Sequence, residues 1–272
     1  MRMRVLVGFY GLNRSLRWTA ASINKNVIAA LRRGDVEVTC AAHFNEPGVI
    51  HDERSGELGI VIDRTGISRL PLDALIIEKQ EEARLPASVL QAISDLPEGP
   101  DVAPLQTMMN LLWQLYSLSQ LWKLIHVTPD HYDGYVFLRP DMEYLDALDP
   151  SLLRQVAGGE VDLISGSWGQ WGGLNDRFGI CSPRGAEVYA QRICGVERLC
   201  EDKSFLHGEP LLKSVAERAN LKLGYTGVRA MRVRADGGTV RGEFDISAYE
   251  FVRGITRKRL HRLRTLFRKQ EG

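Results

Sequence analysis

The chain has no apolar run near the ~18 residues that a membrane-spanning helix needs. Its first residues, MRMRVLVGFYG, are basic, but their apolar stretch is too short for a secretory signal. The cysteines form no CxxC pair and show no ligand-like spacing with the six histidines; they are Cys40, Cys181, Cys194 and Cys200. We therefore expect a cytoplasmic protein with free thiols, and neither a zinc site nor a disulfide framework.

The sequence contains no internal repeat and no low-complexity segment. With 272 residues, 44% hydrophobic and 25% charged, it is typical of a globular chain that can bury a large core. The net charge of the whole chain is close to zero, but the charges are unevenly distributed. Residues 251–272 hold eight Lys/Arg and one acid, which leaves 27 bases and 33 acids in residues 1–250. This split indicates that the tail meets an anionic surface while the body serves another purpose.

The first hundred residues have the pattern of an α/β protein. A β-prone run over 4–11 is followed by a helical periodicity over 16–31 and by a second strand over 36–41. These three pieces resemble a βαβ unit, which predicts a parallel sheet. Residues 45–71 are predicted to be connecting structure with short strands, and residues 72–77 offer another strand.

The second part of the chain begins with its longest predicted helix. Residues 105–125 are apolar almost all round and contain no Gly or Pro, which predicts a buried central helix. A β-prone run over 133–138 then stops at Arg139-Pro140-Asp141. Because ligands of open α/β sheets bind at the carboxyl ends of the strands, Arg139 and Asp141 are candidates for ligand binding.

Three polar clusters could carry chemistry, and the first follows the first strand. Gly8 and Gly11 would let backbone N–H groups approach a phosphate, and Arg14 could fork onto a diphosphate. A tight turn explains the two glycines equally well.

The second cluster is Arg139-Pro140-Asp141. Its carboxylate is placed to hold a divalent ion or a ribose hydroxyl at the end of a strand. The alternative is an Asp that caps the turn and pairs with the neighbouring Arg.

The third cluster lies in the Gly-rich segment 166–178. Trp168 and Trp171 are candidates for stacking on a sugar, and Asn175, Asp176 and Arg177 supply groups that bind hydroxyls and phosphates. The alternative is a pair of core tryptophans beside an Asx turn.

Taken in order, the segments of the chain resemble a family of bacterial glycosyltransferase-like proteins found among capsule and lipopolysaccharide biosynthesis enzymes. The resemblance covers roughly residues 4–237 and rests on GFYGLNRS, SINKNVIAAL, QLYSLSQLWKL, YDGYVFLRPDMEYL, GGLNDRFGICSPRGAEVYAQR, HGEPLL and MRVRADG. Its most specific pieces are LRPD, ending at Asp141, and NDRF, beginning at Asn175. The resemblance implies a nucleotide-sugar-dependent transferase of the GT-A type, with a mixed, mainly parallel, Rossmann-like sheet flanked by helices.

The resemblance also implies roles for particular residues. Gly8, Gly11 and Arg14 would face the nucleotide, and Arg139-Pro140-Asp141 would hold the donor diphosphate, a task for which GT-A enzymes often use Mn²⁺ or Mg²⁺. Here Arg139 stands where the first acid of the usual DxD motif would be, so the Arg could partly neutralise the diphosphate itself.

For the reacting centre, the resemblance places Asn175, Asp176 and Arg177 on the sugar and acceptor side. Glu209 would lie near the reacting atoms, and Glu209 or Asp176 would take the acceptor proton in an inverting enzyme. The alternative for Glu209 is a charge at a helix N-terminus, and His207 has either a sugar-binding or a structural role.

We therefore predict a GT-A-like domain over 1–245 and a basic amphipathic helical tail over 246–272. The predicted activity is transfer of a sugar from a nucleotide donor to a growing surface glycan, free or lipid-linked. Residues 251–272 would bind anionic lipid at the inner face of the cytoplasmic membrane. For the tail, the alternatives are docking on the acidic body, a dimer contact or, least favoured, nucleic acid. For the body, they are another sugar-nucleotide-modifying enzyme or a non-catalytic scaffold bound to a membrane or partner.

Overall fold

The computed structural model describes residues 2–52, 55–81, 84–97, 102–127, 131–203 and 205–239. The predicted tail over 246–272 and the domain boundary at residue 245 lie outside these residues. In the part of the chain that is described, no helix is both long enough and apolar enough to cross a membrane.

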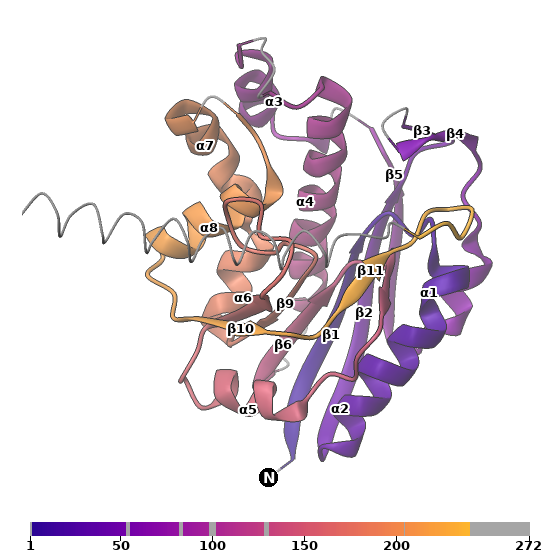
Figure 1. Ribbon diagram of the computed structural model, residues 1–272, viewed down its shortest axis with the longest axis vertical. Coiled ribbons are helices and arrows are strands. Elements are labelled where there is room, and N and C mark those ends of the chain that lie inside the picture. Colours follow the sequence, from indigo (N-terminus) through magenta and orange to yellow (C-terminus); the bar gives the residue numbers. More distant parts are fainter. Residues whose placement is uncertain are drawn as a thin grey trace, which may run out of the picture.

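A seven-stranded sheet forms the centre of the fold, in the order β10-β8-β9-β6-β1-β2-β5 (Figure 1). Every neighbouring pair is parallel except those made by β9, which runs antiparallel to both β6 and β8. The mixed, mainly parallel α/β class expected from the sequence is confirmed. The strands are β1 (Met3–Gly11), β2 (Val36–Glu46), β5 (Ala74–Lys79), β6 (Gly134–Leu138), β8 (Leu163–Gly166), β9 (Phe178–Cys181) and β10 (Leu223–Thr226).

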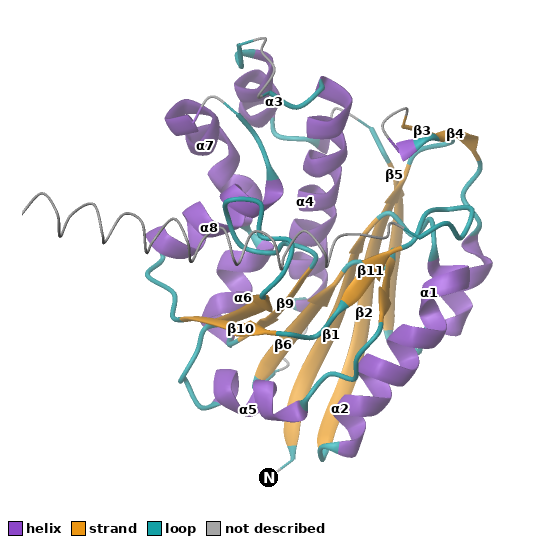
Figure 2. Cartoon of the chain, viewed as in Figure 1, coloured by secondary structure: helices purple, strands orange, loops and turns teal. Residues whose placement is uncertain are grey.

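Two short antiparallel pairs stand beside the main sheet. One is the hairpin of β3 (Ile50–Asp52) and β4 (Glu57–Ile60), and the other joins β7 (Met142–Tyr144) to β11 (Ala230–Arg232). The second pair brings the last described part of the chain next to the segment that follows β6. In Figure 2, the hairpin lies near the upper end of β5, and β11 is drawn in front of the main sheet.

Helices cover both faces of the sheet (Figure 1). The described helices are α1 (Leu16–Ser22), the π-helix η1 (Ile23–Ile28), α2 (Ala29–Arg33), the 3-10 helix η3 (Arg64–Arg69), α3 (Ala87–Ser94), α4 (Leu105–Ile125), α5 (Pro150–Ala157), α6 (Pro183–Ala190), the 3-10 helix η5 (Arg192–Gly195), α7 (Val196–Lys203) and α8 (Gly208–Arg218).

Alternate residues of β1 divide the core into two layers. Val5, Val7 and Phe9 belong to a cluster with residues of α1, η1, α2 and α5, whereas Leu6 and Tyr10 pack with α4, α6 and α8. Such alternation follows from the period of two in a strand, and because all of these side chains are apolar or aromatic, both faces of β1 are buried.

Long elements follow the sequence prediction most closely. The central helix spans the predicted residues 105–125, and the strand expected over 133–138 is β6. The helix predicted over 16–31 consists of α1, the π-helix η1 and α2, which follow one another without a break. Strand β9 was not predicted, because its four residues follow a Gly-rich segment and have no alternating pattern of their own.

Candidate functional site

A cavity of about 740 Å³ opens at the carboxyl edge of the sheet. The chain leaves β1 for β2 on one side and later places β6 on the other, so the edge between β1 and β6 is the topological switch point. Tyr10 and Gly11 at the end of β1 line the cavity, as do Arg139 and Asp141 after β6. The structure places Arg139 and Asp141 on the wall of this cavity, and their predicted role in ligand binding stays a prediction.

Asp141 is held between two arginines at the floor of this cavity. Arg14 Nη2 donates to Asp141 Oδ2 at 2.8 Å, while Arg139 donates through Nε to Oδ1 at 3.0 Å and through Nη2 to Oδ2 at 2.7 Å. Burial alone would raise the pKa of Asp141, but the guanidiniums of Arg139 and Arg14 outweigh it and hold that pKa well below its usual range. Asp141 is therefore a buried carboxylate at neutral pH.

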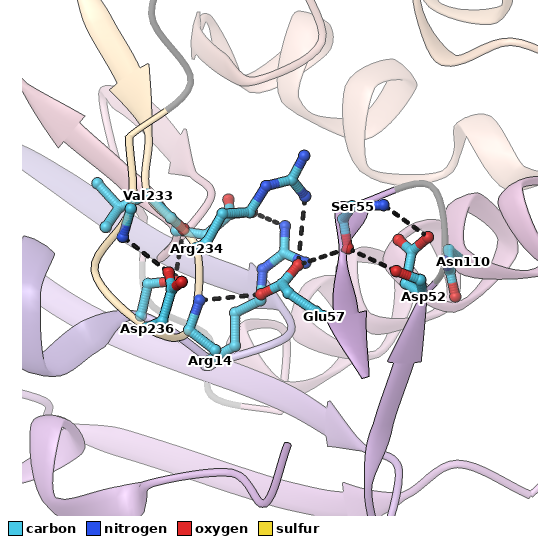
Figure 3. Close-up of polar contacts among 12 residues, drawn as sticks. Arg14, Asp52, Ser55, Glu57, Asn110, Val233, Arg234 and Asp236 are labelled. Atoms are coloured by element: carbon cyan, nitrogen blue, oxygen red, sulfur yellow. Dashed lines mark hydrogen bonds and ion pairs between the residues drawn. The ribbon is translucent and has the colours of Figure 1, made fainter. Parts of the chain in front are cut away.

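Glu57 of β4 extends this charged cluster. Its Oε2 accepts from Arg14 Nη1 at 2.7 Å, from Arg234 Nη1 at 3.2 Å and from Ser55 Oγ at 2.8 Å (Figure 3). Arg232, on β11, also lines the cavity and further lowers the pKa of Asp141. Four guanidiniums thus surround two carboxylates, which leaves the cluster with an excess of positive charge.

The segment after β11 is bonded to the loops that form the cavity. Val233 N donates to Asp141 O at 2.8 Å, and Ser15 Oγ donates to Val233 O at 2.6 Å. Ala235 N donates to Glu57 Oε1 at 2.9 Å. The last described residues therefore hold together the loop after β1, the β3–β4 hairpin and the loop after β6.

This geometry does not fit the metal role predicted for Asp141. Both carboxylate oxygens already accept hydrogen bonds from guanidinium groups, and a cation there would face the positive charges of Arg14 and Arg139. Within the described residues, no three His, Cys, Asp or Glu side chains are grouped so that they could hold a metal ion. The pairing of Asp141 with Arg139 is instead the alternative that the sequence left open for this turn.

A second pair of acids, Asp176 and Glu209, lines the cavity beside the N-terminus of α8. Burial and, to a lesser extent, the negative charge of Asp176 raise the pKa of Glu209 to about 7, against the opposing effect of Arg177. Arg177 Nη1 lies 3.6 Å from Glu209 Oε1. Glu209 can therefore take up or release a proton near neutral pH, as a general base or acid must.

Two glycines make this arrangement possible. A Cβ on Gly173 would lie 2.0 Å from the backbone carbon of Glu209, and a Cβ on Gly208 would lie 2.2 Å from Asp176 Oδ2. The Gly-rich loop before β9 also donates from Leu174 N to Glu209 O at 3.0 Å. The loop can therefore dock on the first turn of α8 only because both positions lack a side chain.

We expect Gly208→Ala to destabilise the protein by about 1–3 kcal/mol, because the new methyl group would push against the buried Asp176 carboxylate. In a helix without this contact, Gly→Ala adds stability. Thermal unfolding measures the effect, and Gly227→Ala is the matched control because no atom lies within 4 Å of its added Cβ. A rise in melting temperature for Gly208→Ala would contradict the contact.

Most of the residues singled out in the sequence lie around this one cavity. Those that line it are Gly11, Arg14, Arg139, Asp141, Trp171, Asp176, Arg177, His207 and Glu209. His207 directly precedes α8, and Trp171 is 46% exposed on the loop before β9. Segments more than 190 residues apart in the sequence therefore meet at one edge of the sheet.

Three of the predicted residues lie away from the cavity wall. Gly8 is three residues inside β1, where a Cβ would lie 2.8 Å from Leu121 Cδ2 of α4, so it serves helix packing. Trp168 is 3% exposed and donates from Nε1 to Val228 O at 2.9 Å, which makes it a core residue. Asn175 is fully buried and donates from Nδ2 to Trp168 O at 2.7 Å, so it shapes the loop.

Gly11 lines the cavity, but its amide has a partner within the protein. Gly11 N donates to Ser117 Oγ of α4 at 2.8 Å, and Ser117 Oγ in turn donates to His43 O at 2.6 Å. The expectation that this N–H binds a phosphate is wrong for the present geometry. Gly11 is needed for its left-handed backbone, with φ of +98°, which turns the chain toward Arg14.

Several lining residues were not predicted from the sequence. They include Arg232 and Arg234 near β11 and the carboxamides Asn45, Gln80, Gln106, Asn110 and Gln114. The spacing of Gln106, Asn110 and Gln114 places all three on one face of α4, and this spacing of four was visible in the sequence. Arg232 and Arg234 belong to the segment MRVRADG, but no pattern in the sequence places them at the cavity, because their position depends on the pairing of β11 with β7.

No family model and no curated protein sequence matches the chain. Among solved structures, the chain is similar to mouse xyloside xylosyltransferase 1 in its apo form, with a TM-score of 0.40 and 10% sequence identity. The match covers 82% of this chain and 84% of the mouse chain.

Proposed function

We propose that the protein is a glycosyltransferase that moves a sugar from a nucleotide-sugar donor to a growing bacterial surface glycan, such as a capsule or lipopolysaccharide chain. One observation carries the proposal: the cavity at the switch point holds a cluster of four arginines and, beside it, the half-buried carboxyl group of Glu209, with a pKa of about 7. The arginines would stabilise an anionic leaving group, and the carboxyl group would accept the proton of an acceptor hydroxyl.

The arginine cluster would bind the donor diphosphate. Guanidinium groups bind phosphate oxygens well. Arg14 gives Nη1 and Nη2 to Glu57 and Asp141, and Arg139 gives Nε and Nη2 to Asp141, so the diphosphate would share these donors with the carboxylates or displace them. Their present partners, Asp141 and Glu57, neutralise only part of the positive charge. The cluster would stabilise the negative charge that develops on the leaving nucleotide, without a metal ion held by Asp141.

Glu209 would act on the acceptor. In the proposed inverting step, the acceptor oxygen forms a bond to the anomeric carbon as its proton moves to the Glu209 carboxylate. The bond from that carbon to the phosphate oxygen breaks, and its electron pair leaves with the nucleoside diphosphate. Asp176 would keep the pKa of Glu209 high enough for this exchange, and Arg177 would hold the carboxyl group in place.

The basic tail supports a lipid-linked glycan as the acceptor, at a membrane surface. Residues 251–272, with eight Lys/Arg and one acid, would hold the enzyme on an anionic membrane surface where lipid-linked glycans are made. A non-catalytic scaffold with the same fold is the second candidate, favoured by this same tail. Removing residues 251–272 would abolish the output of a scaffold, whereas Asp176→Ala would leave that output intact.

The proposal is tested by thermal unfolding with UDP, GDP, CMP and ADP, each with and without Mn²⁺. A ligand at 100 times its Kd should add ~2.7 kcal/mol to the free energy of unfolding. We expect one nucleotide to stabilise the protein in the absence of Mn²⁺, and Arg139→Met to remove that shift. Arg154→Met on α5, exposed and outside the cavity, is the matched control. No shift with any nucleotide, in folded protein, would contradict the proposal.

A further inference from the structure

The cavity has two chemically different walls. The arginine cluster forms one, and α4 contributes the other through Gln106, Asn110 and Gln114. These residues are spaced by four, one helical turn each, so their side chains follow one face of α4 over ~12 Å. None of them carries a charge, which separates this wall from the arginine cluster in the kind of ligand it can bind.

The three carboxamides differ in exposure along α4. Gln106 and Asn110 are exposed, and Gln106 Nε2 donates to Asn110 Oδ1 at 3.0 Å. Gln114 is half-buried near the end of β1, with its Cγ 3.7 Å from where a Cβ on Gly11 would lie. Among the described residues, nothing accepts a hydrogen bond from the buried Gln114 Nε2.

A buried amide nitrogen without a partner is costly, so this donor calls for a ligand or a water molecule. A carboxamide offers both a donor and an acceptor, which is what a sugar hydroxyl, itself donor and acceptor, requires. Trp171, 46% exposed and lining the same cavity, adds an aromatic face against which a ring can stack. Phosphate, which offers only acceptors, would leave the carboxamide oxygens without partners.

We propose that Gln106, Asn110 and Gln114 form a subsite for an uncharged sugar ring with free hydroxyl groups. The inference deepens the proposed function, because the ring could belong to the donor nucleotide-sugar or to the acceptor glycan. In both cases the α4 face sets which sugar is accepted, while the arginine cluster binds the phosphates and is indifferent to the sugar.

The test uses the double variant Asn110→Leu/Gln114→Met. It removes hydrogen-bonding groups from the α4 face while keeping similar side-chain volumes. Gln120→Met, on the same helix but outside the cavity, is the matched control. Asn110→Ala alone, at an exposed position, replaces the double variant if the latter does not keep the melting temperature of the wild type.

Calorimetry would compare UDP with UDP-glucose and UDP-galactose, and GDP with GDP-mannose, while an array of neutral oligosaccharides would probe acceptors. For a donor sugar, we expect one nucleotide-sugar to bind about tenfold more tightly than its nucleotide, and the double variant to lose that gain while binding the nucleotide unchanged. For an acceptor, the nucleotide-sugars bind unchanged and oligosaccharide binding is lost in the variant.

The inference is overturned if the variant weakens a nucleotide and its nucleotide-sugar equally, or if no sugar adds affinity and no oligosaccharide binds to the wild type. In the second case, nucleotide binding alone would leave the proposed function standing. Oligosaccharide binding that depends on Asn110 and Gln114, in a protein that binds none of the nucleotides, would overturn the proposed function and support the subsite.

Discussion

Glu209→Gln should lower the transfer rate by about 10²–10⁴ and yet raise the melting temperature at pH 8. The loss of rate follows because an amide cannot take the acceptor proton. In the wild type, only deprotonated Glu209 acts as a base, so transfer should increase as the pH rises through about 7. The variant should show a low rate without this step.

The gain in stability of the variant should grow over the same pH range. A carboxyl group whose pKa is raised from 4.5 to about 7 in the folded protein destabilises it progressively as pH rises through that window. Gln carries no charge and still offers Arg177 an acceptor oxygen. The variant should therefore be more stable than the wild type above pH 7, by on the order of 2–3 kcal/mol, and similar to it below about pH 4.5.

Thermal unfolding at pH 4.5 and pH 8 measures this difference, together with a transfer assay over the same range. Glu217→Gln on the same helix is the matched control, since Glu217 is 61% exposed and makes only a 3.9 Å contact with Lys213. A Glu209→Gln variant that is less stable than the wild type at pH 8, or that keeps its transfer rate, would contradict the role of Glu209.

Asp141→Asn should cost about 3–5 kcal/mol of stability, because Arg14 and Arg139, both half-buried, lose the negative charge that they share. The cost should be present at neutral pH and should shrink as pH falls below about 4, where an unfolded Asp binds a proton. Asp146→Asn is the control: Asp146 pairs with Arg229 at 2.7 Å but is 34% exposed, so about 0–1 kcal/mol is expected.

The same variant separates two ways of holding a diphosphate. If the arginine cluster binds it directly, removing the negative charge of Asp141 should strengthen nucleotide binding measured without a divalent ion. If Asp141 holds a metal ion, the substitution should instead abolish binding that depends on Mn²⁺. Calorimetry with and without Mn²⁺, below the melting temperature of the variant, distinguishes these results, and we expect the first.

Local patterns were enough to predict the elements that frame the site. The apolar segment without Gly or Pro gave α4 its full length, and the strand ending at Arg139 lies at the centre of the sheet. Chemistry at strand ends was predictable because parallel strands bring their carboxyl ends to one edge. Trp168 was misassigned because the loop around it folds back and gives its indole nitrogen a backbone partner at Val228.

The partners within the site were harder to predict, because they come from distant parts of the chain. Glu57 and Arg14 are 43 residues apart, and Glu57 and Arg234 are 177 apart. Both contacts depend on how β4 and β11 are placed, and these strands are only four and three residues long. A strand over residues 231–234 is predicted from the sequence, but local patterns do not specify what such short strands pair with, so the ion pairs appear only in the folded structure.

The position of β11 makes the last described residues necessary for the structure of the cavity. Arg232 and Arg234 line the cavity. Val233 forms hydrogen bonds with Asp141 and Ser15, and Ala235 forms one with Glu57. A chain shortened before Ala230 would lose both arginines and all three hydrogen bonds. In a series of progressively shorter chains, nucleotide binding and cooperative unfolding should therefore be lost together, at a cut between residues 230 and 236.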